Sequence, residues 1–352
     1  GEGWQLTITT KEGKVLVSAS KWPRYEYGDI IEITCRLERP ESEEFAYDRY
    51  LARHGIYSVC YRPQITFISK DGGNPIYRFI ITVKQRAYEI ARNAIPEPEA
   101  SLALPVVFGG GQDIDEDITE QFRRTGLTHI MAVSGFNVSL LTALIGLGLY
   151  SLGLRRKLVF YITSFLIIGY VIMVGAPASA VRAGVMSLVL LLAITVGRLA
   201  QLPRTVLLVA VMTLLANPRL FRDDIGWQLS FLAILGLLYV LPSIQKLGMR
   251  LSREKGKWIV EALAATIAAQ IATAPVIIYN FEQFSLIAPL ANLLVVWVVP
   301  ILTITMMASL ALTAIFPPLG LIFFFPCWLM VKYIFWIVQL LSQVGWAVWE
   351  ID

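Results

Sequence analysis

The sequence predicts an α+β protein: a small OB-like β-barrel domain followed by a polytopic α-helical transmembrane domain. The composition is that of a membrane protein, because 56% of the 352 residues are hydrophobic and 16% are charged, whereas soluble domains carry about 25% charged residues. The charges are also unevenly distributed. Residues 1–100 hold 14 basic and 14 acidic side chains, but only seven acids follow Leu127. A balanced soluble part and an apolar part therefore share one chain.

The β-rich part is expected over residues 1–83. Alternating apolar and polar side chains predict β-strands. Such strands are expected around Leu6 and Ile8 and at residues 29–37, 65–68 and 76–80. The last two flank Asp-Gly-Gly-Asn-Pro at 71–75, which predicts a turn, and residues 43–57 predict a short helix. About five strands with one helix fit a small barrel of the OB type, or another small β domain.

Residues 84–128 are interpreted as a helical linker. Residues 84–95 predict a helix that ends at a Pro-Glu-Pro sequence, and the apolar stretch 101–108 is too short to span a bilayer before three glycines interrupt it. Residues 113–124 are polar, with apolar side chains at helical spacing. That pattern predicts an amphipathic helix lying on the membrane surface.

Long apolar runs fill residues 129–352 and predict about eight or nine membrane segments, since one span needs about 20 apolar residues. We expect spans near 129–152, 157–175, 181–199, 203–216, 226–244, 258–279 and 285–316, with one or two more in 319–349. The run 285–316 is too long for one straight helix and contains Pro289 and Pro300. We therefore expect it to be kinked or broken.

Loop charges predict the orientation of the chain. Basic residues cluster in the loops after the first, third and fifth spans, at 155–157, 198–204 and 246–257. The alternate loops carry no net positive charge. Because cytoplasmic loops are enriched in Lys and Arg, these three loops are expected inside, and parity places the N-terminal domain outside.

Cysteine usage fits this orientation. Cys35 and Cys60 both fall in the N-terminal domain, where an oxidising compartment would let them form a disulfide. The alternative is two buried free thiols. Cys327 lies in an apolar run and is interpreted as a filler that faces lipid or another helix.

The sequence offers little catalytic chemistry. Two histidines, His54 and His129, form no metal-ligand cluster, and no GxxxxGK[ST] phosphate loop occurs, so no metal, cofactor or catalytic residue is predicted. An intramembrane serine hydrolase would use Ser134 as nucleophile and His129 as base. On one helix, however, these residues would lie about 140° apart around the axis. We interpret Ser134 and Gly135 as small residues that permit close helix packing.

Polar side chains within the expected spans are costly and usually face a cavity or a polar partner. They are Ser134, Asn137, Arg182, Gln228, Ser230, Gln270, Asn280, Asn292 and Lys332. Arg182 stands near the start of a span, so snorkelling to the interface is an alternative to a role inside. Gln228 and Ser230 lie about 200° apart on a helix, so helix–helix hydrogen bonding explains at least one of them.

Several segments together resemble the ComEC family of competence proteins. Phe45–Tyr57 is similar to the family's F-D-Y-x-x-Y-L-x-x-x-G-I signature and follows a Tyr-Gly-Asp strand entry. Phe122–Gly135 is similar to its F-x-x-x-G-x-x-H-x-x-A-[VI]-S-G block. Further matches in the same order are Val181-Arg182-Ala183, Gly197-Arg198, Asn217-Pro218, Trp227–Ala233 and Ala291-Asn292-Leu293.

The resemblance implies a multi-pass protein of the bacterial inner membrane that conducts single-stranded transforming DNA into the cytoplasm. The chain departs from the family in two ways. Asn137 stands where the family commonly has a histidine after the Ser-Gly pair, and the His/Asp signature of a metallo-β-lactamase-like domain is missing, as is an N-terminal anchor. A nuclease activity would therefore reside outside this chain, which looks like a piece of a longer protein.

The resemblance also implies site residues and partners. The OB-like domain would stack bases on aromatics and track phosphates with basic side chains, and the candidates are Lys21, Trp22, Arg24, Tyr25, Tyr27 and Arg36. The candidates for lining or gating the channel are His129, Ser134, Asn137, Arg182, Gln228, Gln270 and Asn292. The expected partners are single-stranded DNA, the lipid bilayer, a cytoplasmic helicase-like ATPase and an extracytoplasmic DNA receptor. A secondary transporter of a small solute or lipid precursor is the main alternative, which a broken span would also suit.

Overall fold

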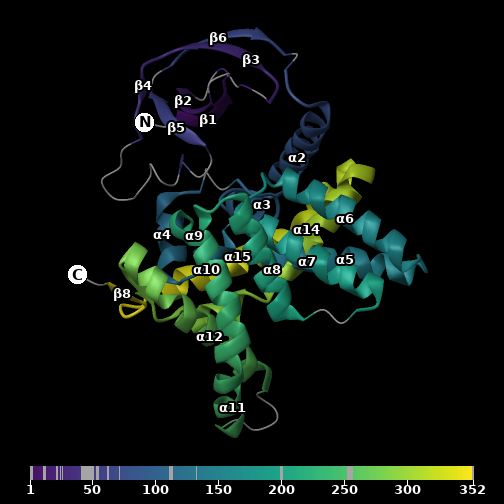
Figure 1. The fold of residues 1–352 in the computed structure, drawn as a ribbon, viewed down its shortest axis with the longest axis vertical. Helices are drawn as coiled ribbons and strands as arrows, with labels where there is room; N and C mark the ends of the chain where they lie inside the picture. The colour runs from purple at the N-terminus through teal and green to yellow at the C-terminus, as the bar shows by residue number, and fades with distance from the viewer. Residues whose placement is uncertain are drawn as a thin grey trace. The chain divides into compact units, whose positions relative to one another are not determined.

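The computed structural model describes residues 3–10, 13–20, 23, 25, 27–40, 51–52, 55–61, 63–70, 72–110, 114–131, 133–198, 201–251 and 257–350. The chain divides into two compact units (Figure 1). Unit 1 contains residues 1–82 and 212–225, and unit 2 contains residues 83–211 and 226–352. The β-rich and helical parts expected from the sequence are therefore confirmed.

Unit 1 is built on two small sheets. The first has the order β1-β2-β5-β4, in which β2 and β5 are parallel and the other neighbours antiparallel. In the second sheet, β3 pairs with β6. The strands are β1 Gly3–Thr9, β2 Lys14–Ser20, β3 Ile30–Thr34, β4 Leu37–Glu38, β5 Ile56–Tyr61 and β6 Gln64–Ser69. Leu16, Leu51, Ile56 and Val59 form a buried apolar cluster. Closure of these strands into an OB barrel stays a prediction.

The strand expected at 76–80 is wrong, because these residues lie in helix α2, Pro75–Ala94. The turn signal before them is in fact a helix start. The side-chain oxygen of Asn74 accepts hydrogen bonds from the backbone N–H groups of Ile76 at 2.8 Å and Tyr77 at 3.5 Å. Pro75 supplies a preset helical φ at the first position.

The helix expected at 43–57 is wrong at its end, since Ile56 and Tyr57 lie in strand β5. Gly55 separates the two conformations with φ +75°, a backbone region that suits glycine. Of the remaining residues, Leu51 and Ala52 are helical, whereas 43–50 and 53–54 lie outside the described residues.

Unit 2 is helical and also contains most of α2. Its helices include α3 Glu99–Phe108, α4 Glu116–Arg124, the 3₁₀ turn η1 Thr128–Ile130, α5 Gly135–Ser151, α6 Arg156–Met173, α7 Ala178–Val196, α8 Leu202–Ala216, α10 Ile225–Leu235, the π-turn η2 Gly236–Val240, α11 Leu241–Leu251, α12 Lys257–Phe281, α13 Ala288–Val295, α14 Val298–Ile315 and α15 Gly320–Ser342. The chain leaves unit 2 within α8 and returns to it near the start of α10. The short helix α9, Leu220–Asp223, lies between them and belongs to unit 1.

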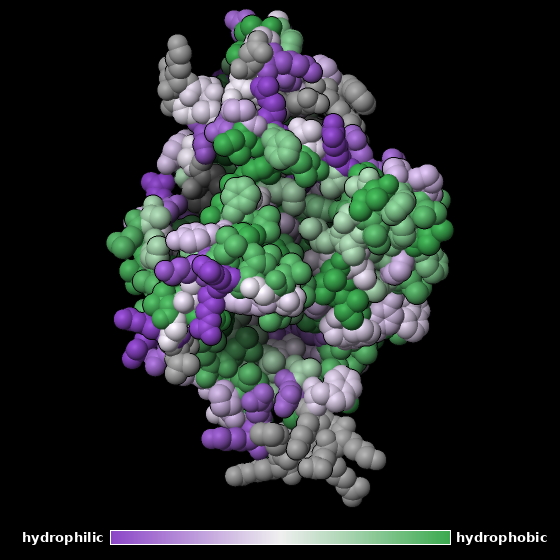
Figure 2. Space-filling view, turned by 90° about the vertical axis from the view of Figure 1, so that its right-hand side faces the viewer, coloured by the Kyte–Doolittle hydropathy of each residue, from purple (hydrophilic) through white to green (hydrophobic). Residues whose placement is uncertain are grey.

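Within the described residues, six helical stretches are long and apolar enough to cross a membrane. They are Arg156–Met173, Ala178–Val196, Ile225–Gly248, Trp258–Phe281, Ala288–Ile315 and Pro317–Ser342. Their outer surfaces are apolar, with side chains such as Phe165 and Leu321 exposed by 78% and 67%. Figure 2 shows broad hydrophobic areas over the helices on the face that it displays. Such surfaces suit contact with lipid, so the multi-pass membrane character is confirmed.

One span starts later than expected: the first begins at Gly135 rather than near 129, because η1 and an extended Ser134 precede it. The long seventh run breaks as expected, here between α13 and α14. Of the one or two spans expected in 319–349, the structure has one, α15. The chain then forms strand β8, Val348–Glu350, which pairs with β7, Gln283–Ser285.

The amphipathic helix expected at 113–124 is present as α4, capped by the Asp115 side chain. Its apolar side packs against protein. Phe122 is fully buried and makes an edge-to-face contact with Phe335 of α15 at a ring separation of 6.2 Å. The sequence pattern marked this apolar face correctly but could not say that another helix, and not lipid, covers it.

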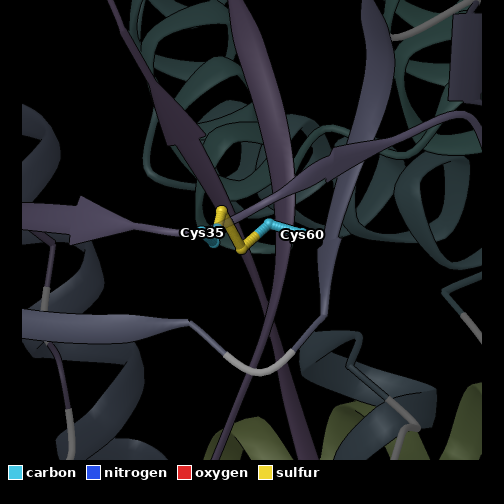
Figure 3. Close-up of a disulfide and its surroundings, with 2 residues drawn as sticks. All are labelled: Cys35 and Cys60. Carbon is cyan, nitrogen blue, oxygen red and sulfur yellow. A yellow bond between two sulfur atoms is a disulfide. The ribbon is translucent and has the colours of Figure 1, made fainter.

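Two cysteines connect the strands of unit 1. Cys35, between β3 and β4, and Cys60, in β5, are joined by a disulfide with a Cα–Cα distance of 6.2 Å (Figure 3). Cys327 is a buried free thiol within α15, and its Sγ lies 3.7 Å from the Ser309 hydroxyl of α14. It therefore fills a helix–helix contact.

We expect the Cys35–Cys60 bond to form in the folded protein, where it closes a loop of 25 residues and stabilises unit 1 by about 3 kcal/mol. Alkylation under denaturing, non-reducing conditions should modify only Cys327, and alkylation after reduction should modify all three cysteines. The masses of the alkylated chains measure this. Modification of all three without reductant would contradict the prediction, and a Cys327→Ser chain is the control for the site of labelling.

Candidate functional site

Side chains of three other helices donate hydrogen bonds to backbone carbonyls at the carboxyl end of helix α3. The last seven residues of α3 are all buried, so its terminal carbonyl groups are kept from water. Backbone carbonyls left unpaired at a helix end are costly in an apolar interior. Side chains from three other helices satisfy them.

Each of these side chains donates one hydrogen bond. The Asn137 Nδ2 of α5 donates to the Val106 carbonyl at 2.9 Å, and the Tyr170 hydroxyl of α6 donates to the Val107 carbonyl at 2.6 Å. The Tyr88 hydroxyl of α2 donates to the Gly109 carbonyl. Asn137 and Tyr170 are 1% and 6% exposed, which makes these bonds interior contacts rather than surface caps.

The backbones at the ends of α3 and α6 also approach each other closely at Gly109. Gly109 ends α3 with φ +71°, and a Cβ at this position would lie 2.8 Å from the Val174 carbonyl at the end of α6. Only glycine tolerates both the conformation and the contact. The sequence predicted a break at this glycine run but not the reason for it.

Ser134 is the N-cap residue of helix α5. Its hydroxyl caps the helix by accepting from the Asn137 backbone N–H at 3.4 Å, a typical N-cap contact. Gly135 faces α7, where an added Cβ would lie 3.1 Å from the Ala183 Cβ. The expected role of these small residues in close packing is thus visible between α5 and α7.

His129 is not on the same helix as Ser134. It lies in η1, where its Nδ1 is 3.2 Å from the Gly126 carbonyl. A carbonyl can only accept, so Nδ1 is the protonated nitrogen in this contact. Each residue of the suspected Ser–His pair therefore has its own structural partner.

Arg182 is buried inside the membrane unit, at 3% exposure. Its Nη2 donates to the Gly226 carbonyl at 2.8 Å and its Nε to the Ser230 hydroxyl at 3.3 Å, both on α10. The alternative of snorkelling is therefore wrong, because the guanidinium links α7 to α10. Ser230 faces this arginine, whereas Gln228 is half-buried on another side of α10.

The other two expected channel residues lie near the chain segments that follow α12. Gln270 Nε2 donates to the Ser285 carbonyl of β7 at 3.3 Å. Asn292 of α13 has its Oδ1 buried, with no partner among the described residues. The seven expected residues thus lie at separate places: in η1 and the first turn of α5, on α7 and α10, and on α12 and α13. Their arrangement around one pore stays a prediction.

The DNA-binding residues expected in unit 1 are only partly described. Lys21, Trp22 and Arg24 lie outside the described residues. Tyr25 is half-buried and Arg36 is exposed. The Tyr27 ring packs edge-on against Tyr77 with centroids 4.6 Å apart, and its hydroxyl accepts from the Asn74 N–H at 3.1 Å. Tyr27 therefore holds the start of α2, which leaves less of its ring for stacking.

Sequence reasoning missed Tyr88 and Tyr170. A tyrosine within an apolar helix reads as a membrane-interface anchor, and its partner is a backbone carbonyl that carries no sequence signal. The neighbouring glycines were the available clue, because a short apolar helix that stops at glycines must have its carbonyls satisfied.

Comparison with known proteins gives a consistent result. The model of the family described as "Competence protein" matches residues 106–352. The chain is 24% identical over 277 residues to ComE operon protein 3 of Bacillus subtilis (strain 168). This match covers 77% of the chain but 34% of that relative, so the chain spans about a third of the relative's length. No solved structure matches.

Replacing Asn137 by alanine should leave the Val106 carbonyl buried without its donor, at a cost of about 1–3 kcal/mol in the free energy of unfolding. Thermal unfolding of purified protein in detergent measures the loss. The matched control is Asn280→Ala, since the Asn280 amide donates to Val276 of its own helix at 2.8 Å and ties no other helix. Equal losses in the two variants would contradict a capping role.

Two substitutions of Ser134 separate a helix cap from a nucleophile. Alanine removes the cap and should cost about 0.5–2 kcal/mol, whereas asparagine caps as well as serine does. We therefore expect Ser134→Asn to keep both stability and transformation in a naturally competent host. Loss of transformation in both variants, with normal protein levels, would favour the hydrolase instead.

Proposed function

Since the chain belongs to the competence protein family, we propose that it conducts a single strand of DNA across the cytoplasmic membrane during natural competence. A role in competence DNA uptake follows from the family. The finer points (a single strand, a conduit through unit 2 and a receiving domain outside) are our proposal.

The observation that carries the conduit is the buried arginine between α7 and α10. A cation inside a membrane helix is costly and is usually retained where it faces a pathway or a polar partner. The bonds from Arg182 to a carbonyl and a hydroxyl of α10 hold its guanidinium at a fixed place between the two helices. A cation held there would attract a polyanion that crosses this unit.

Contacts within unit 2 fit a scheme of eight crossings, which we propose. The segment before α5 meets the segment after α12 where the Ser285 hydroxyl donates to the Arg124 carbonyl at 2.8 Å. The pairing of β7 with β8 adds the segment after α15. These three segments lie on one side of the membrane if the helices that cross it are α5, α6, α7, α8, α10, α12, the pair α13 and α14, and α15. We propose that this side is extracytoplasmic, which the positive-inside bias of the intervening loops supports.

The connection between α8 and α10 fits the same count. It follows four crossings, so it too is expected outside. It belongs to unit 1 together with the strands, and the Arg219 Nη1 donates to the Tyr57 hydroxyl of β5 at 3.1 Å. The N-terminal sheet is thus proposed to lie outside, where incoming DNA arrives. An ATPase partner or the proton gradient would supply the energy, since the sequence has no phosphate loop.

Arg182 variants test the conduit in the full-length protein of a naturally competent host. Arg182→Ala removes the fixed cation and both bonds to α10, so it should lower the transformation frequency by about tenfold or more. Arg182→Lys keeps the charge but cannot reproduce both bonds, so its transformation frequency should lie between those of the unmodified protein and Arg182→Ala. Transformation frequency and the amount of protein in membranes are measured.

Arg198→Ala, in a loop after α7, is the control and should transform normally. Full transformation by Arg182→Ala at normal protein levels would contradict the proposal. Transformation that stays intact while uptake of a small solute is lost would favour the secondary transporter, to which the broken α13–α14 pair is also suited.

A further inference from the structure

Helix α15 carries a lysine on its outer surface, far from both of its ends. Lys332 is exposed and lies 12 residues after Gly320, the first residue of α15, and 10 residues before Ser342, the last. These intervals correspond to about 18 Å and about 15 Å along the helix axis. Among the described residues of the six long apolar stretches, no other exposed charged side chain is so distant from both ends. Lysines near the end of a span snorkel to the interface, but this position is near neither end.

The Lys332 ammonium points toward the beginning of the helix. Its Nζ lies 4.6 Å from the centroid of the Trp328 ring, and Trp328 is still eight residues, or about 12 Å, from Gly320. This cation–π contact stabilises the charge in part. The ammonium makes no hydrogen bond or ion pair with the described residues. Facing lipid alone, such a cation would be costly.

Helix α15 packs against its own unit through one face. The residues of that face recur at alternating intervals of three and four, and they are buried in the core shared with α3 and α14. Intervals of three and four are those of a seam between two helices. The buried series is Phe324, Cys327, Val331, Ile334, Val338 and Leu341.

The opposite face of α15 has the same repeat but is exposed. Its series is Phe325, Leu329, Lys332, Trp336, Gln339 and Gln343. The three polar members lie within about 40° of one another around the helix axis, so they form one stripe from mid-depth to the carboxyl end. Polar side chains on a span form hydrogen bonds across to a neighbouring helix, whereas lipid tails offer them no partner. The exposed face is therefore built as a seam for a second helix.

We propose that this exposed face of α15 binds a transmembrane helix of a partner protein, and that this helix carries a carboxylate at mid-depth that pairs with Lys332. The unpaired cation requires an anion, and the intervals of three and four fit a helix. Gln339 and Gln343 would form hydrogen bonds with the same helix nearer its end. The interaction is separate from the conduit proposed above, which rests on Arg182.

The described spans of a second copy of this chain offer no carboxylate at the required depth. Glu261 of α12 is the acid within the six apolar stretches. Helices α12 and α15 end on the same side, because the strands that follow them pair. Glu261 lies 20 residues before Phe281, the end of α12, or about 30 Å, whereas Lys332 lies about 15 Å before the end of α15. In a symmetric pair of copies the two charges would be at different depths, which favours a different protein as the partner.

The test measures binding of a fluorescent model helix to the purified chain in uncharged detergent, by fluorescence anisotropy. The probe is a synthetic peptide of about 20 leucine and alanine residues with one central glutamate. The control peptide has glutamine in its place. Because charge-assisted hydrogen bonds are about twice as strong as neutral ones, we expect the glutamate peptide to bind at least about fivefold more tightly. A peptide with its glutamate near one end should bind like the glutamine peptide.

Variants of Lys332 assign the preference to the lysine. Lys332→Leu should abolish the preference for glutamate, and Lys332→Arg should keep it. The control is Lys246→Leu, which removes an exposed lysine near the end of another apolar stretch and should keep the preference. Unfolding temperatures verify that each variant is folded. Equal binding of the two peptides by the unmodified chain, or a preference that survives in Lys332→Leu, would overturn the proposal.

Two further measurements address other occupants of this face. A dimer, detected by light scattering, that Lys332→Leu dissociates would show that a second copy covers the face, and the proposal would be wrong. The same conclusion follows if Lys332→Leu, but not Lys246→Leu, weakens binding of a fluorescein-labelled oligodeoxythymidine, because the lysine would then face DNA. Unchanged mass and unchanged oligonucleotide binding, together with the loss of glutamate preference, would support a partner helix.

Discussion

The hydrogen bonds at the carboxyl end of α3 are the constraint around which unit 2 is organised. A ten-residue helix is about 15 Å long, which is too short to span a bilayer, so its last carbonyls end within protein. An apolar interior offers them no water. The bonds from Asn137, Tyr170 and Tyr88 replace that water, and they come from α5, α6 and α2. These bonds therefore fix the positions of α2, α5 and α6 relative to the end of α3.

The rest of the unit follows from burying α3. Its apolar side chains share one core with those of α14 and α15, including Leu302, Met306 and Phe324. Because α15 also buries Phe122 of α4, the short helices that precede the first span are part of the core. They are not a linker between two independent domains. The family match, which begins at residue 106 within α3, agrees that this segment belongs with the membrane helices.

The sequence predicted the features that depend on composition and on local signals. Apolar runs marked the spans, Pro289 and Pro300 marked the broken seventh segment, and alternation marked most of the strands. It failed where one signal has two meanings. The Asp-Gly-Gly-Asn-Pro sequence was interpreted as a turn between two strands, yet Asn74 and Pro75 start a helix equally well. The choice depends on whether the following apolar side chains are buried at intervals of two or of three to four residues.

The candidate site was predictable only in part, and for a related reason. A polar side chain inside a span needs a polar partner. For this reason the sequence correctly marked Asn137 and Arg182 as residues with interior contacts. Their partners are backbone carbonyls of Val106 and Gly226, and any residue type supplies a carbonyl. Arg39 and Arg219 line one cavity in unit 1, but the sequence did not predict that they share it, because each looks like an ordinary loop charge.

The amide at position 137 also limits what this site can do. The carboxyl end of a helix carries a partial negative charge, which favours a cationic or hydrogen-bond-donating neighbour. A histidine in this environment would change its charge near neutral pH, and the resembled family commonly has one at the corresponding position. Asn137 donates the same kind of bond but has no proton to exchange. The bond from Asn137 to the Val106 carbonyl is therefore independent of pH, and position 137 cannot relay protons. Coupling of transport to a proton gradient, if the protein uses one, must involve other residues.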